Sequence, residues 1–136
     1  VRKLIISEQP INPEYYKKMS ELLDALIQQR RNGALAYQEY LASFIDLTRK
    51  VKNPKFGTTY PSGIDTNAKR ALYDNLGKDE DRALVVDKAV RENRQDDWRN
   101  NPFKVKKIRI AITDALDGDK ELAEKTLNIV KKQHEY

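Results

Sequence analysis

The chain of 136 residues contains no cysteine and only one histidine. Without cysteine it has no disulfide, no thiolate nucleophile and no cysteine zinc site. Nothing therefore favours an oxidising compartment, and we predict a cytoplasmic protein. The histidine, His134, lies within the last three residues. A single histidine in that place supports neither a Ser-His-Asp triad nor a histidine metal site.

Long hydrophobic runs are also absent. The first apolar run, Leu4 to Ile6, is far too short for a membrane span or a signal peptide, so we predict no membrane partner. The sequence begins at Val1 without a methionine. We therefore expect the chain to be a piece of a longer polypeptide.

Two motifs for phosphate or metal binding are incomplete. Gly77-Lys78 resembles the end of a P-loop, but Leu72 stands where the first glycine is required and Asp79 where the hydroxyl is required. Residues 117–122 carry the alternating carboxylates of a calcium loop. The sixth position, where that loop requires glycine for a sharp turn, is Leu122, so a helix cap is the better interpretation. No nucleophile, base and stabiliser occur together, and we predict no catalytic residue, cofactor or metal site in the chain.

The composition is that of a folded, basic protein. Hydrophobic residues make up 39% of the chain and charged residues 35%, with a net charge of +5. A chain of this length can bury one core, so we predict a single domain over residues 1–136. Residues 28–70 hold eight Lys and Arg against three Asp and Glu. This asymmetry can build a basic face that attracts phosphates or an acidic protein, whereas solvated helix flanks are the ordinary alternative.

Helix signals recur along the chain. Asn12-Pro13 has the cap and first-turn residues of a helix, and apolar residues at three- and four-residue spacing continue it to about Asn32. The same spacing over residues 37–51 predicts a second helix, antiparallel to the first and ended by Asn53-Pro54. These two helices are expected to form a hairpin.

Four further helices are predicted after this hairpin. Ser62 or Asp65 caps the third, Asp79 caps the fourth, Asn101-Pro102 begins the fifth, and the sixth follows Gly118. The run from Leu4 to Ile6 suggests a short strand or extended arm that packs against another element. The predicted fold class is all-α: an irregular bundle of about six helices with one short N-terminal extended segment.

Residues 92–112 combine a polar loop, which holds the only tryptophan, with the basic start of the fifth helix. The structural interpretation of Trp98 buries its ring and bonds its indole N–H to a carbonyl. The functional interpretation exposes the ring for stacking on a base or docking on a partner, with help from Arg94 and Arg99. The structural interpretation is favoured, because a buried tryptophan contributes strongly to packing.

Several cations are candidates for binding DNA or a protein partner. Those near the start of the fifth helix oppose its dipole, which suggests a use such as neutralising phosphates. The full candidate set comprises Arg30, Arg31, Lys50, Lys52, Lys55, Arg94, Trp98, Arg99, Lys104, Lys106, Lys107 and Arg109.

Several stretches, in order and at similar spacing, resemble the C-terminal region of the restriction subunit of type I restriction-modification enzymes. They cover nearly the whole chain. They are Asn12-Pro13-Glu14-Tyr15-Tyr16 with the helix through Arg30-Arg31, Tyr37-Gln38-Glu39-Tyr40-Leu41, Ala68-Lys69-Arg70-Ala71-Leu72-Tyr73-Asp74-Asn75-Leu76, Glu92-Asn93 through Asp97-Trp98-Arg99, Asn101-Pro102, Lys106-Lys107-Ile108 and Val130-Lys131-Lys132-Gln133-His134-Glu135-Tyr136.

The resemblance implies a parent subunit with a nuclease domain and an ATP- and Mg-dependent motor that pulls DNA. It also implies partners: the methyltransferase and specificity subunits, and double-stranded DNA. None of the family's nuclease or motor motifs matches a position here. The resemblance therefore implies a non-catalytic helical module that docks the motor to the methyltransferase core and contacts DNA.

Two other hypotheses stay open at this point. The first is a purely structural assembly domain without DNA affinity, and the second, disfavoured by the missing sites, is an autonomous enzyme. DNA guidance requires the cations of residues 30–55 or 104–109 to share one exposed face, whereas pure docking requires an exposed apolar patch.

Overall fold

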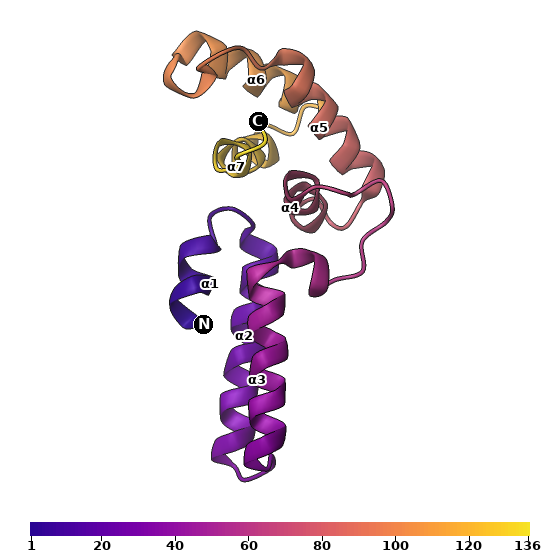
Figure 1. Cartoon of the computed structure of the whole chain (residues 1–136). Coiled ribbons are helices and arrows are strands. Elements are labelled where there is room, and N and C mark those ends of the chain that lie inside the picture. Colours follow the sequence, from indigo (N-terminus) through magenta and orange to yellow (C-terminus); the bar gives the residue numbers. More distant parts are fainter. The chain divides into compact units, whose positions relative to one another are not determined.

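The computed structural model describes residues 1–136 as helices and turns, without a strand, which confirms the all-α prediction (Figure 1). The chain divides into two compact units, Val1–Tyr60 and Pro61–Tyr136. Unit 1 contains α1 (Arg2–Glu8), α2 (Pro13–Arg31), α3 (Tyr37–Lys52) and the 3-10 turn η1 (Pro54–Phe56). Unit 2 contains α4 (Asn67–Asn75), α5 (Glu80–Asn93), the 3-10 turn η2 (Trp98–Asn100), α6 (Pro102–Ala115) and α7 (Lys120–Lys131). The single domain over 1–136 stays a prediction.

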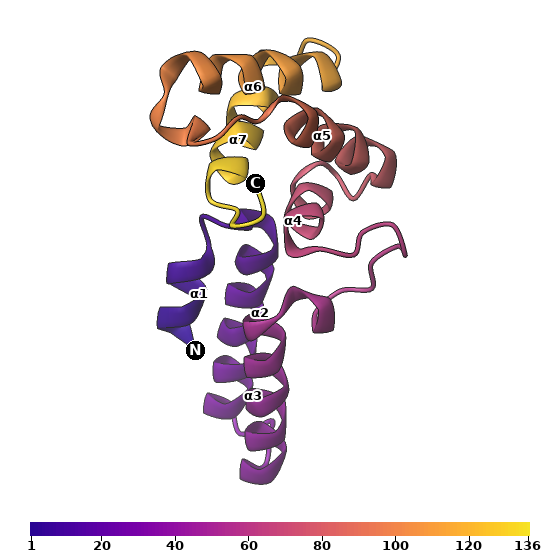
Figure 2. The same cartoon turned by 45° about the horizontal axis from the view of Figure 1, so that its top comes forward.

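Unit 1 is built on the predicted hairpin of α2 and α3, which lie side by side in Figures 1 and 2. Two tyrosines near the start of α2 join it to the end of α3. The Tyr15 hydroxyl donates to the Lys50 carbonyl at 2.5 Å, and the Tyr16 hydroxyl donates to the Val51 carbonyl at 3.0 Å. These bonds bring opposite ends of the two helices together, so the hairpin is antiparallel.

Burial follows the predicted apolar spacing of the hairpin. The buried core of unit 1 comprises Ile5, Tyr15, Tyr16, Met19, Leu23, Leu26, Leu47 and Val51. Tyr16 is only 4% exposed, and its burial raises the pKa of its hydroxyl to about 12. Asn12 accepts a hydrogen bond from the Tyr15 amide, which confirms it as the cap of α2.

The prediction of an extended segment at Leu4 to Ile6 is wrong, because these residues lie within α1. A three-residue apolar run does not distinguish a strand from a helix. The helix places Ile5 in the core of unit 1 and packs Leu4 against it. Arg2 bonds to Ser20 and forms an ion pair with Asp24, which fixes α1 along α2.

In unit 2 the predicted caps are mostly confirmed. Asp79 accepts from the Arg82 amide at 3.1 Å, and Asn101 and Asp119 cap α6 and α7 in the same way. The cap of α4 is neither Ser62 nor Asp65 but Thr66. The Asp65 carboxylate instead pairs with Lys69 at 3.0 Å, one turn along the helix.

The core of unit 2 gathers one apolar face from each of its four α-helices. Its fully buried large side chains are Leu72, Val86, Val90, Ile108, Ile112, Leu116, Leu127 and Val130. None of the helices in either unit is both long enough and apolar enough to cross a membrane.

Gly57, just after η1, has no room for a side chain. A Cβ there would lie 2.7 Å from Cζ and 2.8 Å from Cε2 of the buried Tyr15 ring, and closer still to its hydroxyl. We predict that Gly57→Ala lowers the free energy of unfolding by about 1–3 kcal/mol, because either the ring or the turn must shift. Urea unfolding followed by circular dichroism measures the effect.

Gly63→Ala is the matched control for this substitution. A Cβ at Gly63 would come within 2.8 Å of the end of the flexible Glu80 side chain and would make an ordinary van der Waals contact with Leu84 at 3.6 Å. We expect a change within about 0.5 kcal/mol. An equal decrease in the free energy of unfolding of the two variants would contradict the close approach of Gly57 to Tyr15.

Candidate interaction surfaces

The guanidinium group of Arg99 in η2 binds the end of unit 2. Its Nε donates to the Lys131 carbonyl at 2.9 Å, Nη1 to the Tyr136 carbonyl at 2.7 Å and Nη2 to the Gln133 carbonyl at 2.5 Å. The donors of Arg99 are thus engaged within the molecule. Arg99 thereby holds the end of unit 2 in place, and its prediction as a DNA or partner contact stays a prediction.

Arg94 acts on the same segment. Its Nη1 donates to the Glu135 carbonyl at 2.7 Å. The Glu135 carboxylate in turn accepts from the Ala68 amide at 2.9 Å, in the first turn of α4. A carboxylate at a helix N-terminus is favourable, because the unpaired amides and the dipole are positive there. The last residues of unit 2 therefore stabilise its first helix.

Tyr136 closes this segment, residues 131–136, against α5. Its hydroxyl donates to the Asp87 carboxylate, which is only 6% exposed. Arg91 donates to both Asp87 oxygens, at 3.0 and 3.1 Å, and lies over the Tyr136 ring at 5.3 Å. Burial, followed by the hydrogen bond to Asp87, raises the pKa of Tyr136 well above its usual value.

Trp98 is 3% exposed, as the structural interpretation of this residue requires. The Arg99 guanidinium stacks over the Trp98 ring, with its Cζ 4.6 Å from the ring centroid. The predicted hydrogen bond of the indole N–H is absent: Nε1 is buried without a partner. The carbonyls of the C-terminal segment accept from Arg99 instead.

Two of the four candidate cations on α6 are also engaged within unit 2. The Lys104 ammonium donates to the Asp96 carbonyl at 2.6 Å, and Arg109 forms an ion pair with Glu124 of α7. Lys106 and Lys107 are exposed, and their side chains form no hydrogen bond or ion pair. They are the free cations of this helix.

The solvent side of α6 is also apolar. Phe103 is 84% exposed and Ile110 is 52% exposed. Phe103 and Lys107 are four residues apart, as are Lys106 and Ile110, so helical spacing puts them on the side away from the buried stripe. We call Phe103, Lys106, Lys107 and Ile110 the α6 outer face.

Neither apolar residue of this face was among the predicted contact residues. A signal was present, because Phe103 and Ile110 fall outside the spacing of Val105, Ile108 and Ile112, which are buried. An apolar residue outside the stripe that faces the core points toward solvent, and it is therefore a candidate for contact with another molecule.

The unit 1 candidates do not form one cluster. Arg30 donates to the Leu35 carbonyl at 2.8 Å, and Lys50 pairs with Asp46 at 2.9 Å. The side chains of Arg31, Lys52 and Lys55 are exposed and unpaired, but Arg31 lies at one end of α3 and the two lysines at the other. Sixteen residues of helix separate them by roughly 24 Å.

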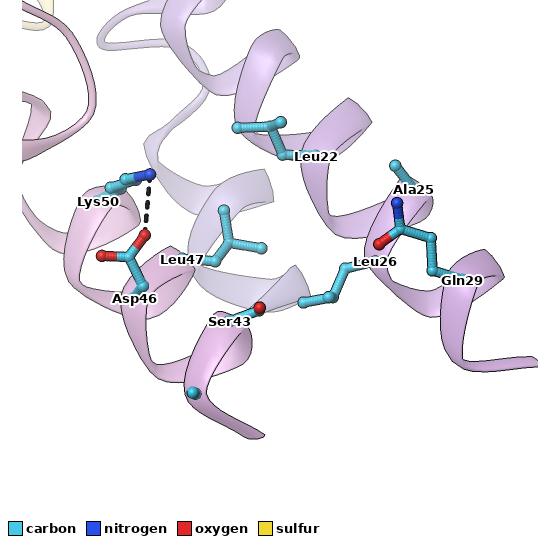
Figure 3. A pocket seen from close by; sticks show the side chains of 9 residues that line it. Leu22, Ala25, Leu26, Gln29, Ser43, Asp46, Leu47 and Lys50 are labelled. Carbon is cyan, nitrogen blue, oxygen red and sulfur yellow. Dashed lines mark ion pairs between the residues drawn. The ribbon is translucent and has the colours of Figure 1, made fainter. Parts of the chain in front are cut away.

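A groove of about 450 Å³ runs between α2 and α3 (Figure 3). Leu22 and Leu26 point from α2 toward α3, and Leu47 lies in the floor. The Asp46–Lys50 ion pair marks its α3 side. We call this the hairpin groove; its lining residues are Leu22, Ala25, Leu26, Gln29, Ala42, Ser43, Asp46, Leu47 and Lys50. This groove was not predicted from the sequence, because small residues carry no distinctive pattern.

No protein-family model matches the chain, and neither curated proteins nor solved structures show significant similarity to it. No group of three or more His, Asp or Glu side chains is placed to hold a metal ion. Two of the exposed surfaces combine apolar or small residues with nearby charges: the hairpin groove and the α6 outer face.

Trp98 and Phe103 are two aromatic residues five positions apart with opposite environments. We predict that Trp98→Ala lowers the free energy of unfolding by about 3–5 kcal/mol, because it opens a cavity under Arg99. Phe103→Ala, the matched control, should change it by less than about 0.5 kcal/mol, since the ring is already in water. Urea unfolding of both variants tests this. A Trp98→Ala change in the free energy of unfolding as small as that of Phe103→Ala would contradict the role of Trp98 in packing.

Proposed function

We propose that this chain is a non-catalytic helical module of a type I restriction subunit, which docks the motor of the parent protein onto the methyltransferase core. The observation that carries the proposal is the α6 outer face. It presents Phe103, the most exposed large hydrophobic residue of the chain, and Ile110 between two unpaired lysines. An aromatic anchor with an apolar neighbour and a charged rim is the usual composition of a protein interface.

The charges support docking over DNA guidance as the main role. Of the candidate cations in unit 2, Arg94, Arg99, Lys104 and Arg109 are engaged by groups of the same unit. A duplex-guiding face requires several free cations along one surface, because each neutralises a phosphate. The α6 outer face offers two, Lys106 and Lys107, together with apolar area that has no use on a phosphate backbone.

The resemblance supplies the identity of the partners. Several stretches that carry it are those that build the fold: Asn12 caps α2, and Arg99 binds the segment that ends at Tyr136. The resemblance thus supports a shared fold and context more than a shared contact residue. The methyltransferase and specificity subunits are the proposed partners, and ATP and Mg belong to the proposed parent subunit.

The docking role predicts an interface centred on α6. The full chain should bind the immobilised methyltransferase–specificity core, and Ile110→Glu should raise the dissociation constant at least about tenfold, because it places a charge in the apolar contact. Ile45→Glu is the matched control, since Ile45 is also an exposed mid-helix isoleucine, at 62% exposure. Biolayer interferometry measures both.

Three results are distinguishable in this experiment. Binding that is lost only in the Ile110 variant supports docking through α6. Equal loss in both variants would place the interface elsewhere. No binding of the unaltered, folded chain would refute the docking role itself.

The second candidate function is contact with double-stranded DNA, favoured by the unpaired Lys106 and Lys107. Four neutralised phosphates, as the cations of residues 104–109 suggest from sequence, would give a slope of log affinity against log salt near about −3.6. The two free lysines neutralise at most two phosphates. At roughly 0.9 per phosphate, the expected slope is then no steeper than about −1.8. Fluorescence anisotropy of labelled duplex across a salt series measures it.

The double substitution Lys106→Glu and Lys107→Glu should abolish this binding without unfolding the chain. The corresponding control is Lys52→Glu with Lys55→Glu, two exposed cations of unit 1. Loss of DNA binding in the control pair alone would move the DNA contact to the hairpin. Absence of binding at low salt by the folded chain would leave the purely structural assembly role.

A further inference from the structure

We propose that the hairpin groove is a self-association surface: it binds the hairpin groove of a second copy of this chain, with the two hairpins packed face to face and antiparallel. This inference goes beyond the docking role, which uses a different helix. It rests on the spacing, size and charge of the residues along the groove.

Each helix presents a second row of residues beside its buried one. On α2 the row is Lys18, Leu22, Ala25 and Gln29, and on α3 it is Glu39, Ser43, Asp46 and Lys50. Both rows have the spacing four, three, four, which keeps residues on one side of a helix and is the spacing of helix–helix seams. In both rows the middle positions line the hairpin groove.

Short side chains in the middle of the groove leave space for another helix to approach closely. Ala25 of α2 and Ala42 and Ser43 of α3 have short side chains, and they line the groove together with the larger apolar Leu22, Leu26 and Leu47. Small residues at the crossing let helix backbones approach closely, and the larger apolar residues then fill the space around them. α1 does not fill this groove, since it packs through Arg2 on Ser20 and Asp24, which are not among its lining residues.

Opposite charges lie at opposite ends of the groove. The Tyr16–Val51 hydrogen bond brings the start of α2 level with the end of α3, so Lys18 and Lys50 share one end. Glu39, near the start of α3, belongs to the other end. Lys18 and Glu39 are exposed, and neither side chain has a hydrogen-bond or ion-pair partner. An occupant must therefore carry the reverse order of charge, and an antiparallel copy of the same groove has it.

A twofold axis perpendicular to the helices gives each charged residue of the α3 row, Glu39, Asp46 and Lys50, a polar or oppositely charged neighbour in the other copy. It places Glu39 of each copy opposite Lys50 of the other, and Ser43 opposite Asp46. On α2 the same axis pairs Lys18 with Gln29. Such an isologous contact repeats each pair twice.

The other face-to-face arrangement, with the twofold axis along the helices, places α2 of one copy on α3 of the other. It brings Lys18 of each copy against Lys50 of its neighbour. Like charges directly opposite each other disfavour that arrangement. Charge alone thus selects the α3-on-α3 packing.

The size of the face sets the expected strength. Two helices side by side, about 10 Å apart, over the roughly 24 Å length of α3 cover a face near the lower end of stable dimer interfaces. We therefore expect a reversible dimer that depends on concentration. Analytical ultracentrifugation of the full chain should show a shift from 15.8 kDa toward twice that mass as the concentration rises.

Ser43→Glu tests the location of the contact. It places a carboxylate opposite Asp46 in both halves of the dimer and should raise the dimer dissociation constant at least about tenfold. Leu41→Glu is the matched control: it adds the same charge in the middle of α3, two positions away on a side that does not line the groove. It should leave the dimer unchanged. Circular dichroism confirms that both variants keep their helix content.

A charge exchange tests the orientation. Glu39→Lys should weaken the dimer by placing two lysines together, and adding Lys50→Glu should restore it, because the pair re-forms with reversed sign. Dimerisation that responds to Ser43→Glu but shows no rescue by the exchange would overturn the antiparallel arrangement.

Two outcomes would overturn self-association through the groove. One is a chain that stays monomeric at every concentration, and the other is a dimer that Leu41→Glu disrupts while Ser43→Glu does not. A monomeric chain whose binding to the methyltransferase–specificity core is lost in Ser43→Glu would assign the groove to another protein. These results are separable from the docking role, which is measured through Ile110.

Discussion

Three backbone carbonyls at the end of unit 2, those of Lys131, Gln133 and Tyr136, converge on the guanidinium group of Arg99. A helix leaves its last carbonyls without partners, and a short segment after it has no regular structure to supply them. One planar cation with five donors meets this need, and the Trp98 ring packs against the same cation. The packing of Tyr136 on α5 and the capping of α4 by Glu135 both depend on the position of this segment.

This arrangement shows why a basic composition is a poor guide to a basic surface. Arg94 and Arg99 contribute to the net charge of +5, but their donors are directed at carbonyls of the same unit. The candidate cations that have no partner lie at separate places, on α6 and at the two ends of α3. The proposed docking role rests instead on surfaces where apolar or small residues are exposed.

The local features of the fold were predictable from sequence. Asn12, Asp79 and Asn101 cap helices because their side chains reach amides two or three residues ahead, and the apolar stripes follow helical spacing. The short α1 was not predictable, because three apolar residues carry no period and its helix is held by contacts with α2. The role of Arg99 was also beyond local pattern, since its partners lie 32 to 37 residues away. Surfaces such as the hairpin groove require knowledge of which helices are neighbours.

The contact between Glu135 and Ala68 also bears on the order in which the chain folds during synthesis. The core of unit 1 is built from residues within Val1–Tyr60, so that core can form while the ribosome is still making the rest. Unit 2 cannot complete its structure until Tyr136 has emerged, because the last six residues hold α4, α5 and Arg99. Domains generally fold in the order in which they emerge. Unit 1 is therefore expected to be native while unit 2 still exposes its apolar helix faces, and that interval is when chaperones would be needed.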